Sequence, residues 1–237
     1  MTINDLAPVP SVADAAGRSV ESGRLRFGFW SAIGVVILTA AYFVPLVMGF
    51  ITLPSPDVPF LDPWYSMMEA LIIFTAPMMV LLAIAIHSSS PAKYKPFTLA
   101  SVVFTALMAG VTCCVHFSIL TLSHRPDFTS LPWLASLLSF QWPSVTYDLD
   151  ILAWDVFFPL SVLFLVPVFH GTSLAKAIRA LLLISGLLAV VGLAGLPFDD
   201  MNIRDIGIIG YAVVYPAAAV LLVLFFRRPA RLEITSH

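Results

Sequence analysis

The stretch Tyr147–Pro159, YDLDILAWDVFFP, places acidic residues at the start of a long hydrophobic segment. Asp148 and Asp150 precede the apolar run, and Asp155 stands inside it. A charged side chain in the hydrocarbon of a lipid bilayer is costly, so such residues usually face the interior of a helix bundle. The stretch therefore indicates a transmembrane helix that carries polar side chains into the interior of the protein.

The composition of the whole chain agrees with a membrane protein. Of its 237 residues, 59% are hydrophobic and 11% are charged, whereas charged residues make up roughly 25% of soluble domains. The mean hydropathy is +0.96. We therefore expect an all-α, polytopic integral membrane protein whose partner is the lipid bilayer. A net charge of −2, with basic residues scattered between hydrophobic segments, argues against a nucleic-acid partner.

Six apolar runs are long enough to cross the membrane, since about 20 helical residues span roughly 30 Å of hydrocarbon. We expect the spans at residues 28–52, 64–87, 97–122, 151–170, 176–197 and 204–226. They form a bundle over 27–228, between a disordered tail at 1–26 and a second tail at 229–237. The outer loop 123–150 contains the apolar segment 131–142, which is too short to cross. Its tryptophans favour a segment in the outer interface, and an ordinary packed loop is the alternative.

The charged residues of the loops predict the orientation of the bundle. Basic residues lie before the first span and after the second, fourth and sixth spans: Arg18, Arg24, Arg26, Lys93, Lys95, Lys176, Arg179, Arg227, Arg228 and Arg231. Aspartate dominates the other three loops. By the positive-inside rule both termini are cytoplasmic. We expect a multi-pass protein of the cell membrane, in a bacterium the inner membrane.

Three titratable residues share one depth in three predicted helices. Glu69, His116 and Asp155 each lie roughly 7 to 9 Å inside the outer end of a span, at a rise of about 1.5 Å per residue. Their shared depth predicts a polar pocket in the outer half of the bundle, because converging side chains avoid lipid. The sequence thus predicts a site in which these three residues are catalytic.

Four further residues extend the predicted pocket toward a substrate. Tyr65 lies one helical turn before Glu69 and shares its face. Asp205 and Tyr211 give the sixth span a polar line, and Trp154 precedes the candidate acid of the fourth span. We expect all four to contact the substrate, in a pocket formed by spans two, three, four and six.

The remaining charged residues of the outer side have a structural interpretation. Asp148, Asp150, Asp199 and Asp200 are expected to be solvated or to lie at helix N-termini, where they favour the helix dipole. Arg204 follows Asp200 by four residues and is placed to pair with it.

Each candidate residue also has a purely structural interpretation. His116 can donate to a backbone carbonyl or to Thr112, one turn away. Glu69 and Asp155 can fix the register of neighbouring helices by binding hydroxyls or amides. Tyr211 can be a packing residue with a single hydrogen bond.

The residue types favour proton transfer. A carboxyl group buried away from water favours its neutral form and can donate a proton, while a histidine accepts one. We therefore expect a membrane-embedded acid/base enzyme with Asp155 or Glu69 as the donor and His116 as the base. Its substrate would be a lipid or isoprenoid that enters from the outer leaflet. Two alternatives stay open: a small transporter that binds protons or another cation, and a non-catalytic subunit of an oligomer or membrane complex.

The sequence favours no metal site and leaves the cofactor open. Glu69, His116 and Asp155 are the minimum number of ligands, but zinc sites usually contain more than one histidine. The chain has no GxSxG, HExxH, Walker or CxxC motif.

Overall fold

The computed structural model describes residues 12–55, 60–123 and 125–227. Every regular element in these ranges is helical. Six segments among them are long and apolar enough to cross a membrane: Ser19–Thr52, Trp64–Ser89, Ala92–Leu122, Val145–Val168, Ser173–Phe198 and Met201–Arg227. The prediction of an all-α bundle with six spans is confirmed, and the chain is a multi-pass membrane protein.

The first three spans are continuous and the last three are interrupted. The first three are α1 (Val12–Thr52), α2 (Trp64–Ser89) and η2 (Ala92–Tyr94) with α3 (Lys95–Leu122). The outer loop holds α4 (Pro126–Thr129) and α5 (Pro132–Leu138). The fourth span comprises α6 (Val145–Ile151), η3 (Leu152–Phe157), α7 (Phe158–Leu163) and η4 (Val166–Val168). The fifth span comprises α8 (Ser173–Gly192) and α9 (Gly195–Phe198). The sixth span comprises α10 (Met201–Ile209), η5 (Gly210–Val214) and α11 (Tyr215–Arg227).

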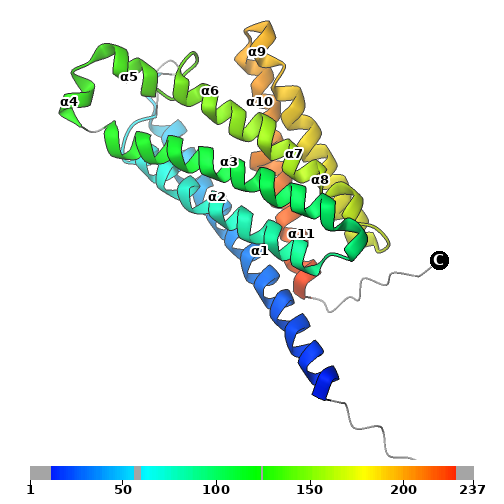
Figure 1. Ribbon diagram of the computed structural model, residues 1–237. Helices are drawn as coiled ribbons and strands as arrows, with labels where there is room; N and C mark the ends of the chain where they lie inside the picture. The colour runs from blue at the N-terminus through cyan, green and yellow to red at the C-terminus, as the bar shows by residue number, and fades with distance from the viewer. Residues whose placement is uncertain (1–11, 56–59, 124, 228–237) are drawn as a thin grey trace, which may run out of the picture.

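The spans form one bundle in which α1 packs on α2 and α11, α2 packs on α3, and α8 packs on α7, α10 and α11. The start of α1 and the end of α11 lie at one end of the bundle, and α4, α5 and α9 lie at the other (Figure 1). We call these the terminal end and the loop end. The described parts of both chain ends are therefore on the same side.

Two spans contain a π-helical segment just before a proline. The N–H of Phe158 bonds to Ala153 O at the end of η3, and the N–H of Tyr215 bonds to Gly210 O at the end of η5. The next residues, Pro159 and Pro216, have no N–H for a regular helical bond. A wider turn at such a position is a known way of accommodating an interrupted helix, and π-turns are frequent at functional sites.

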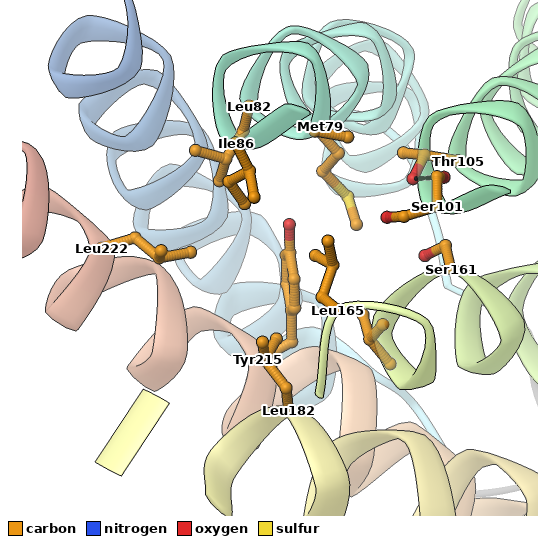
Figure 2. Close-up of a pocket in the computed structure, with 12 residues that line it drawn as sticks. Met79, Leu82, Ile86, Ser101, Thr105, Ser161, Leu165, Leu182, Tyr215 and Leu222 are labelled. Carbon is orange, nitrogen blue, oxygen red and sulfur yellow. Dashed lines mark hydrogen bonds between the residues drawn. The ribbon is translucent and has the colours of Figure 1, made fainter. Parts of the chain in front are cut away.

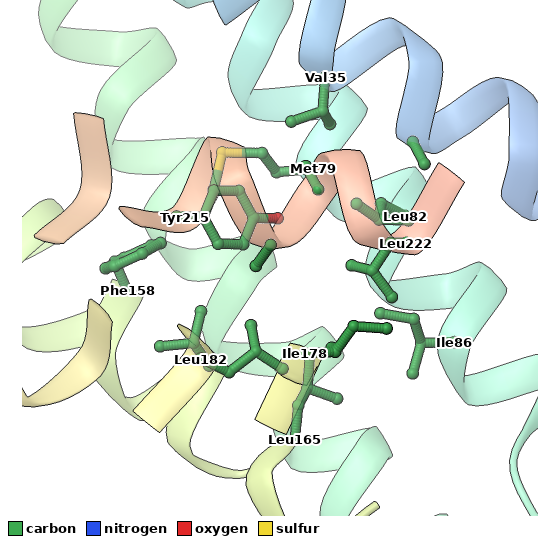
Figure 3. Close-up of a cluster of buried hydrophobic side chains, with 14 of the residues drawn as sticks. Val35, Met79, Leu82, Ile86, Phe158, Leu165, Ile178, Leu182, Tyr215 and Leu222 are labelled. Atoms are coloured by element: carbon green, nitrogen blue, oxygen red, sulfur yellow. The ribbon is translucent and has the colours of Figure 1, made fainter. Parts of the chain in front are cut away.

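The apolar core lies between α2, α7, α8 and α11 (Figure 3). Phe158, Ile178 and Leu182 are fully buried there. Between α8 and α10 the backbones themselves approach, because a Cβ on Gly192 would lie 2.8 Å from the Cα of Gly207. Small residues allow this close approach, which is how helices gain contact in lipid, where the hydrophobic effect between helices is absent.

Two expected boundaries are wrong. The chain is helical from Val12, so the disordered tail expected at 1–26 does not extend over 12–26. A helix that the first span has already nucleated propagates readily through a segment rich in alanine and arginine. Residues 1–11 and the expected tail at 229–237 lie outside the described residues. The fourth span begins at Val145 instead of residue 151, which brings Asp150 into the helix.

Candidate functional site

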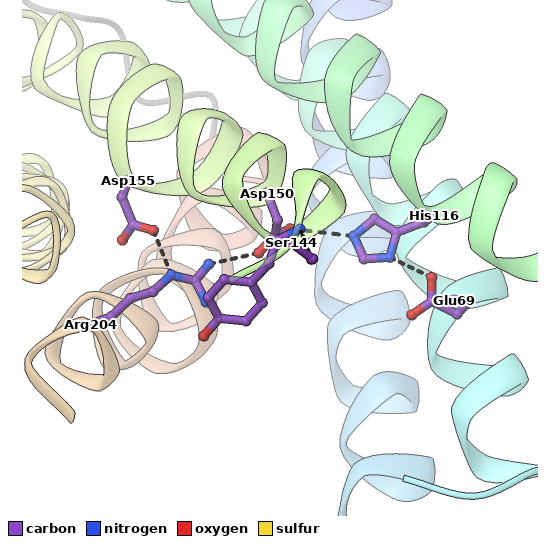
Figure 4. A network of polar contacts seen from close by, with 7 residues as sticks. Glu69, His116, Ser144, Asp150, Asp155 and Arg204 are labelled. Atoms are coloured by element: carbon purple, nitrogen blue, oxygen red, sulfur yellow. Dashed lines mark hydrogen bonds and ion pairs between the residues drawn. The ribbon is translucent and has the colours of Figure 1, made fainter. Parts of the chain in front are cut away.

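Five side chains form one line of contacts (Figure 4). They lie in the parts of their spans that are nearer the loop end of the bundle. Glu69 Oε2 lies 2.7 Å from His116 Nδ1, and His116 Nε2 lies 3.5 Å from Asp150 Oδ1. Arg204 Nη2 donates to Asp150 Oδ2 at 2.7 Å, and its Nε donates to Asp155 Oδ2 at 3.1 Å. Acids and bases therefore alternate along the line. We call these five residues the ion chain.

The ion chain is buried and crosses the bundle. Its five residues are between 1% and 5% exposed. They come from α2, α3, α6, η3 and α10, which are parts of spans two, three, four and six. Charges removed from water to this degree are stable only when they are paired and hydrogen-bonded. The ion chain supplies that pairing between helices that are far apart in sequence.

Two helix caps position the acids and the arginine. Ser144 is the N-cap of α6, where its Oγ accepts the N–H of Tyr147 at 3.1 Å. Asp200 is the N-cap of α10, where its Oδ1 accepts the N–H of Asn202 at 3.0 Å. Such caps fix where a helix begins. Asp150 therefore falls in the second turn of α6, and Arg204 follows directly after the first turn of α10.

Aromatic rings cover the ion chain on the side of the outer loop. The ring of Tyr147 lies 4.5 Å from Arg204 Cζ, a cation–π contact. The ring of Phe140 lies 5.5 Å from both His116 and Tyr147, measured between centroids. Trp142 packs beside Tyr147 and donates from Nε1 to Asp199 Oδ1 at 3.2 Å. We call Phe140, Trp142 and Tyr147 the aromatic cover, since together they lie against the histidine and the arginine.

A second group of rings lies next to the ion chain. Trp154 and Tyr211 are 5.0 Å apart between centroids, and Phe158 is 5.8 Å from Trp154 and 5.9 Å from Tyr211. We call Trp154, Phe158 and Tyr211 the aromatic layer. Trp154 belongs to η3 and Tyr211 to η5, so both π-helical segments contribute a ring.

Three buried polar atoms at the ion chain have no hydrogen-bond partner among the described residues. They are His116 Nε2, Asp155 Oδ1 and Thr112 Oγ1. His116 Nε2 and Asp150 Oδ1 are close enough for an ion pair but do not meet hydrogen-bond geometry. Buried polar atoms of this kind need an explanation, such as bound water or a proton-transfer role. The polar atoms that could bind a water therefore lie on His116, on Thr112 one turn away along α3, and on Asp155 at the other end of the ion chain.

The structure brings part of the predicted catalytic set into contact. Glu69 and His116 touch directly, whereas Asp155 joins them only through Arg204 and Asp150. The expectation that Asp150 is solvated is wrong, because α6 starts early enough to carry it into the bundle. The pairing expected between Arg204 and the acid four residues before it is also wrong, because that acid caps α10 instead.

The other outer-side predictions have mixed outcomes. Asp148 and Asp199 are exposed, and Asp200 stands at a helix N-terminus, as expected. Tyr65 is half-buried. Asp205 is exposed while its neighbour on α10 is buried, so it lies on another face of the helix, outside the ion chain.

The substrate contacts expected of Tyr65, Trp154, Asp205 and Tyr211 stay predictions. No cluster of three or more His, Cys, Asp and Glu side chains is arranged to hold a metal ion in the described ranges. Models of known protein families, curated proteins and solved structures give no match to this chain.

Proposed function

We propose that this protein binds protons near the loop end of the membrane and passes them between Glu69 and Asp150 through His116. The observation that carries the proposal is the position of the imidazole, whose two nitrogens face two different carboxyl groups. An imidazole can take a proton on one nitrogen while it releases another from the second nitrogen. The ring therefore does not have to rotate for a proton to pass.

The transfer step is balanced within these three residues. The Glu69 carboxyl gives its proton to Nδ1, and the proton on Nε2 moves to the Asp150 carboxylate. Glu69 becomes a carboxylate, Asp150 becomes a carboxylic acid, and His116 changes from one neutral tautomer to the other. Before a second proton can pass in the same direction, the imidazole must return to its first tautomer, by rotation of the ring or by exchange of its protons with water.

The charge balance of the ion chain supports an exchangeable proton. With every member ionised, three carboxylates face one imidazolium and one guanidinium, which leaves one negative charge. A single unbalanced charge is costly among helices in lipid. The transfer step keeps this single negative charge, because it only moves a proton within the ion chain. The uptake of one further proton from outside brings the charge to zero. The guanidinium of Arg204 stays charged and cannot carry that proton, so its role is a fixed positive charge held between Asp150 and Asp155.

Infrared spectroscopy of the purified protein tests the proposal through its carboxyl groups. We expect a carboxyl band that titrates with pH in the wild type and is lost in Glu69→Gln and altered in Asp150→Asn. Asp148→Asn is the matched control, since Asp148 is an exposed acid on the same helix. A folded wild-type protein whose titrating band survives both buried substitutions would contradict the proposal.

One observation favours a second candidate, the acid/base enzyme. Glu69 orients His116 through Nδ1 and leaves Nε2 without a hydrogen bond, which is the arrangement of an oriented general base. A lipid or isoprenoid is the matching substrate class, with Asp155 as donor. Lipid profiles of cells that express wild type or Asp155→Asn distinguish the candidates: an accumulating or missing lipid supports the enzyme, and identical profiles contradict it.

We further infer that both termini are cytoplasmic and that the ion chain lies near the outer face. The inference rests on the basic residues that flank the terminal end and on the positive-inside rule. The proposed location is the cell membrane, in a bacterium the inner membrane. An oligomer or a larger complex stays a proposal for the partners beyond lipid, and a stable, monodisperse purified protein would argue against an obligate complex.

A further inference from the structure

A small cavity lies inside the bundle (Figure 2). The sequence positions of its lining residues place it farther toward the terminal end than the ion chain. Residues from α2, α3, α7, α8 and α11 line it, and its volume suits about one water molecule. Three of the lining residues are eleven positions from an ion-chain residue of the same span. Thr105 precedes His116, Ser161 follows Asp150, and Tyr215 follows Arg204. At about 1.5 Å per residue, the cavity is roughly 16 Å deeper along the helices.

The cavity presents hydroxyl groups to its interior. Ser101 is 1% exposed, lines the cavity, and its Oγ has no hydrogen-bond partner among the described residues. The hydroxyl of Tyr215 points into the same space (Figure 2). Thr105 and Ser161 donate to backbone carbonyls and keep their oxygens free to accept. A buried water needs two to four polar partners, which these hydroxyls supply.

The hydroxyl groups of α3 continue on one face of the helix in both directions. The face consists of buried residues three, four or seven positions apart: Thr98, Ser101, Thr105, Thr112 and His116. It covers a rise of about 27 Å, close to the thickness of the hydrocarbon. At its terminal end Thr98 Oγ1 lies 2.8 Å from His87 Nδ1. A histidine that can exchange protons therefore stands at each end of this polar face.

An apolar layer interrupts the polar face between the cavity and the ion chain. Phe158 of the aromatic layer is fully buried and contacts Tyr211 on one side and Tyr215 on the other, at centroid distances of 5.9 and 5.3 Å. On α3 the fully buried Met108 stands between Thr105 and Thr112. The aromatic rings of the layer come from the fourth and sixth spans, which contain the π-helical segments η3 and η5. Such π-helical turns occur frequently at functional sites.

We propose that the cavity binds an ordered water, and that this water and the polar face of α3 form the second half of a gated path by which protons cross the membrane. The path runs from His87 and Thr98 to the water at Ser101 and Tyr215, and then across the aromatic layer to His116. The inference rests on the proposed proton relay at His116. Transfer across the layer needs a rearrangement at η3 and η5, so the protein is a slow, gated carrier of protons and not an open channel.

Proton flux into liposomes tests the path. The purified full-length chain is reconstituted in vesicles that contain a pH-sensitive dye, and a valinomycin-induced potassium potential drives the flux. We expect Ser101→Ala and Tyr215→Phe each to slow the flux by about tenfold, the effect of losing one buried hydrogen bond on a barrier. Ser118→Ala on the same helix is the matched control, because its hydroxyl bonds to the carbonyl of Cys114 and is absent from the cavity lining.

The infrared titration of the carboxyl groups is recorded on the same vesicles, which separates the two proposals. A titrating relay without flux in the wild type would overturn the path and leave the relay standing. Flux that both cavity variants leave unchanged would also overturn the path. Flux without a titrating relay would contradict the proposed function instead. Melting curves of both variants establish whether they remain folded. Because the two substitutions change different side chains, a loss of folding in one of them still leaves the other to test the path.

Discussion

Asp155 and Arg204 meet at 3.1 Å, and the other oxygen of this aspartate lies against the backbone of Gly207. The second oxygen of Asp155 points at Gly207 on α10, where a Cβ would lie 2.5 Å from Oδ1. A side chain at residue 207 would therefore have to displace the carboxylate that pairs with Arg204. The first prediction tests this displacement.

We expect Gly207→Ala to displace the Asp155 carboxylate and to lower the stability of the protein, although alanine favours a helix by about 0.5 to 1 kcal/mol over glycine. Gly110→Ala on α3 is the control, because no atom lies within 4 Å of the added Cβ. It should be neutral or slightly stabilising. Thermal unfolding in detergent measures both, and equal effects of the two substitutions would contradict the predicted clash.

Removing the arginine should be more damaging than removing an exposed one. Arg204→Met leaves Asp150 and Asp155 buried without their cation, and breaking a buried pair in this way costs about 3 to 5 kcal/mol. Arg179→Met on α8 removes an exposed arginine and should change the unfolding free energy little. Adding Asp150→Asn and Asp155→Asn to Arg204→Met should restore part of the loss. No recovery in the triple variant would mean that Arg204 acts by packing and not by charge.

We expect Tyr147 to stabilise the protein through the cation–π contact of its aromatic ring and not through its hydroxyl group. The Arg204 guanidinium lies over that ring at 4.5 Å. Tyr147→Leu removes the cation–π contact, worth about 0.5 to 2 kcal/mol, whereas Tyr147→Phe retains it. Comparing the unfolding midpoints of the two variants checks the prediction, and a phenylalanine variant as unstable as the leucine variant would assign the effect to the hydroxyl.

Cysteine labelling on intact cells tests the proposed orientation. In a background with Cys113→Ala and Cys114→Ala, we expect Ser130→Cys to react with a membrane-impermeant maleimide. Ala92→Cys should react only after the cells are opened. Ser130 and Ala92 are exposed residues near opposite ends of α3. The reverse pattern of labelling would place the termini outside and the ion chain near the cytoplasm.

The bundle could be predicted from the sequence because the bilayer imposes one simple requirement, an apolar run of sufficient length. Comparing the depths of polar residues along their spans also identifies two residues that meet. Glu69 and His116 have the same predicted depth, and the structure places them in contact on neighbouring helices. The prediction of the spans and the comparison of depths can both be made without information on which helices are neighbours. Both follow from position along a single segment.

The rest of the site depends on contacts that no local pattern encodes. Arg204 pairs with acids 49 and 54 residues earlier in the chain. The helical spacing of four residues, which is all that a local pattern offers, indicates Asp200 instead. The sequence alone places Asp150 in a loop, because a charged residue normally marks the end of an apolar span. Two signals in the sequence pointed the other way. Ser144 is a strong N-cap residue, and the two acids and one histidine predicted in the pocket already leave a negative charge that a further cation would balance.

The order of synthesis gives the contact between Arg204 and the two aspartates a consequence for biogenesis. The ribosome delivers the fourth and fifth spans before Arg204 exists, so Asp150 and Asp155 enter the translocon without their cation. Until the sixth span arrives, this part of the bundle must stay close to water or to the insertion machinery. The sixth span, which carries Arg204, is therefore the one that completes the ion chain.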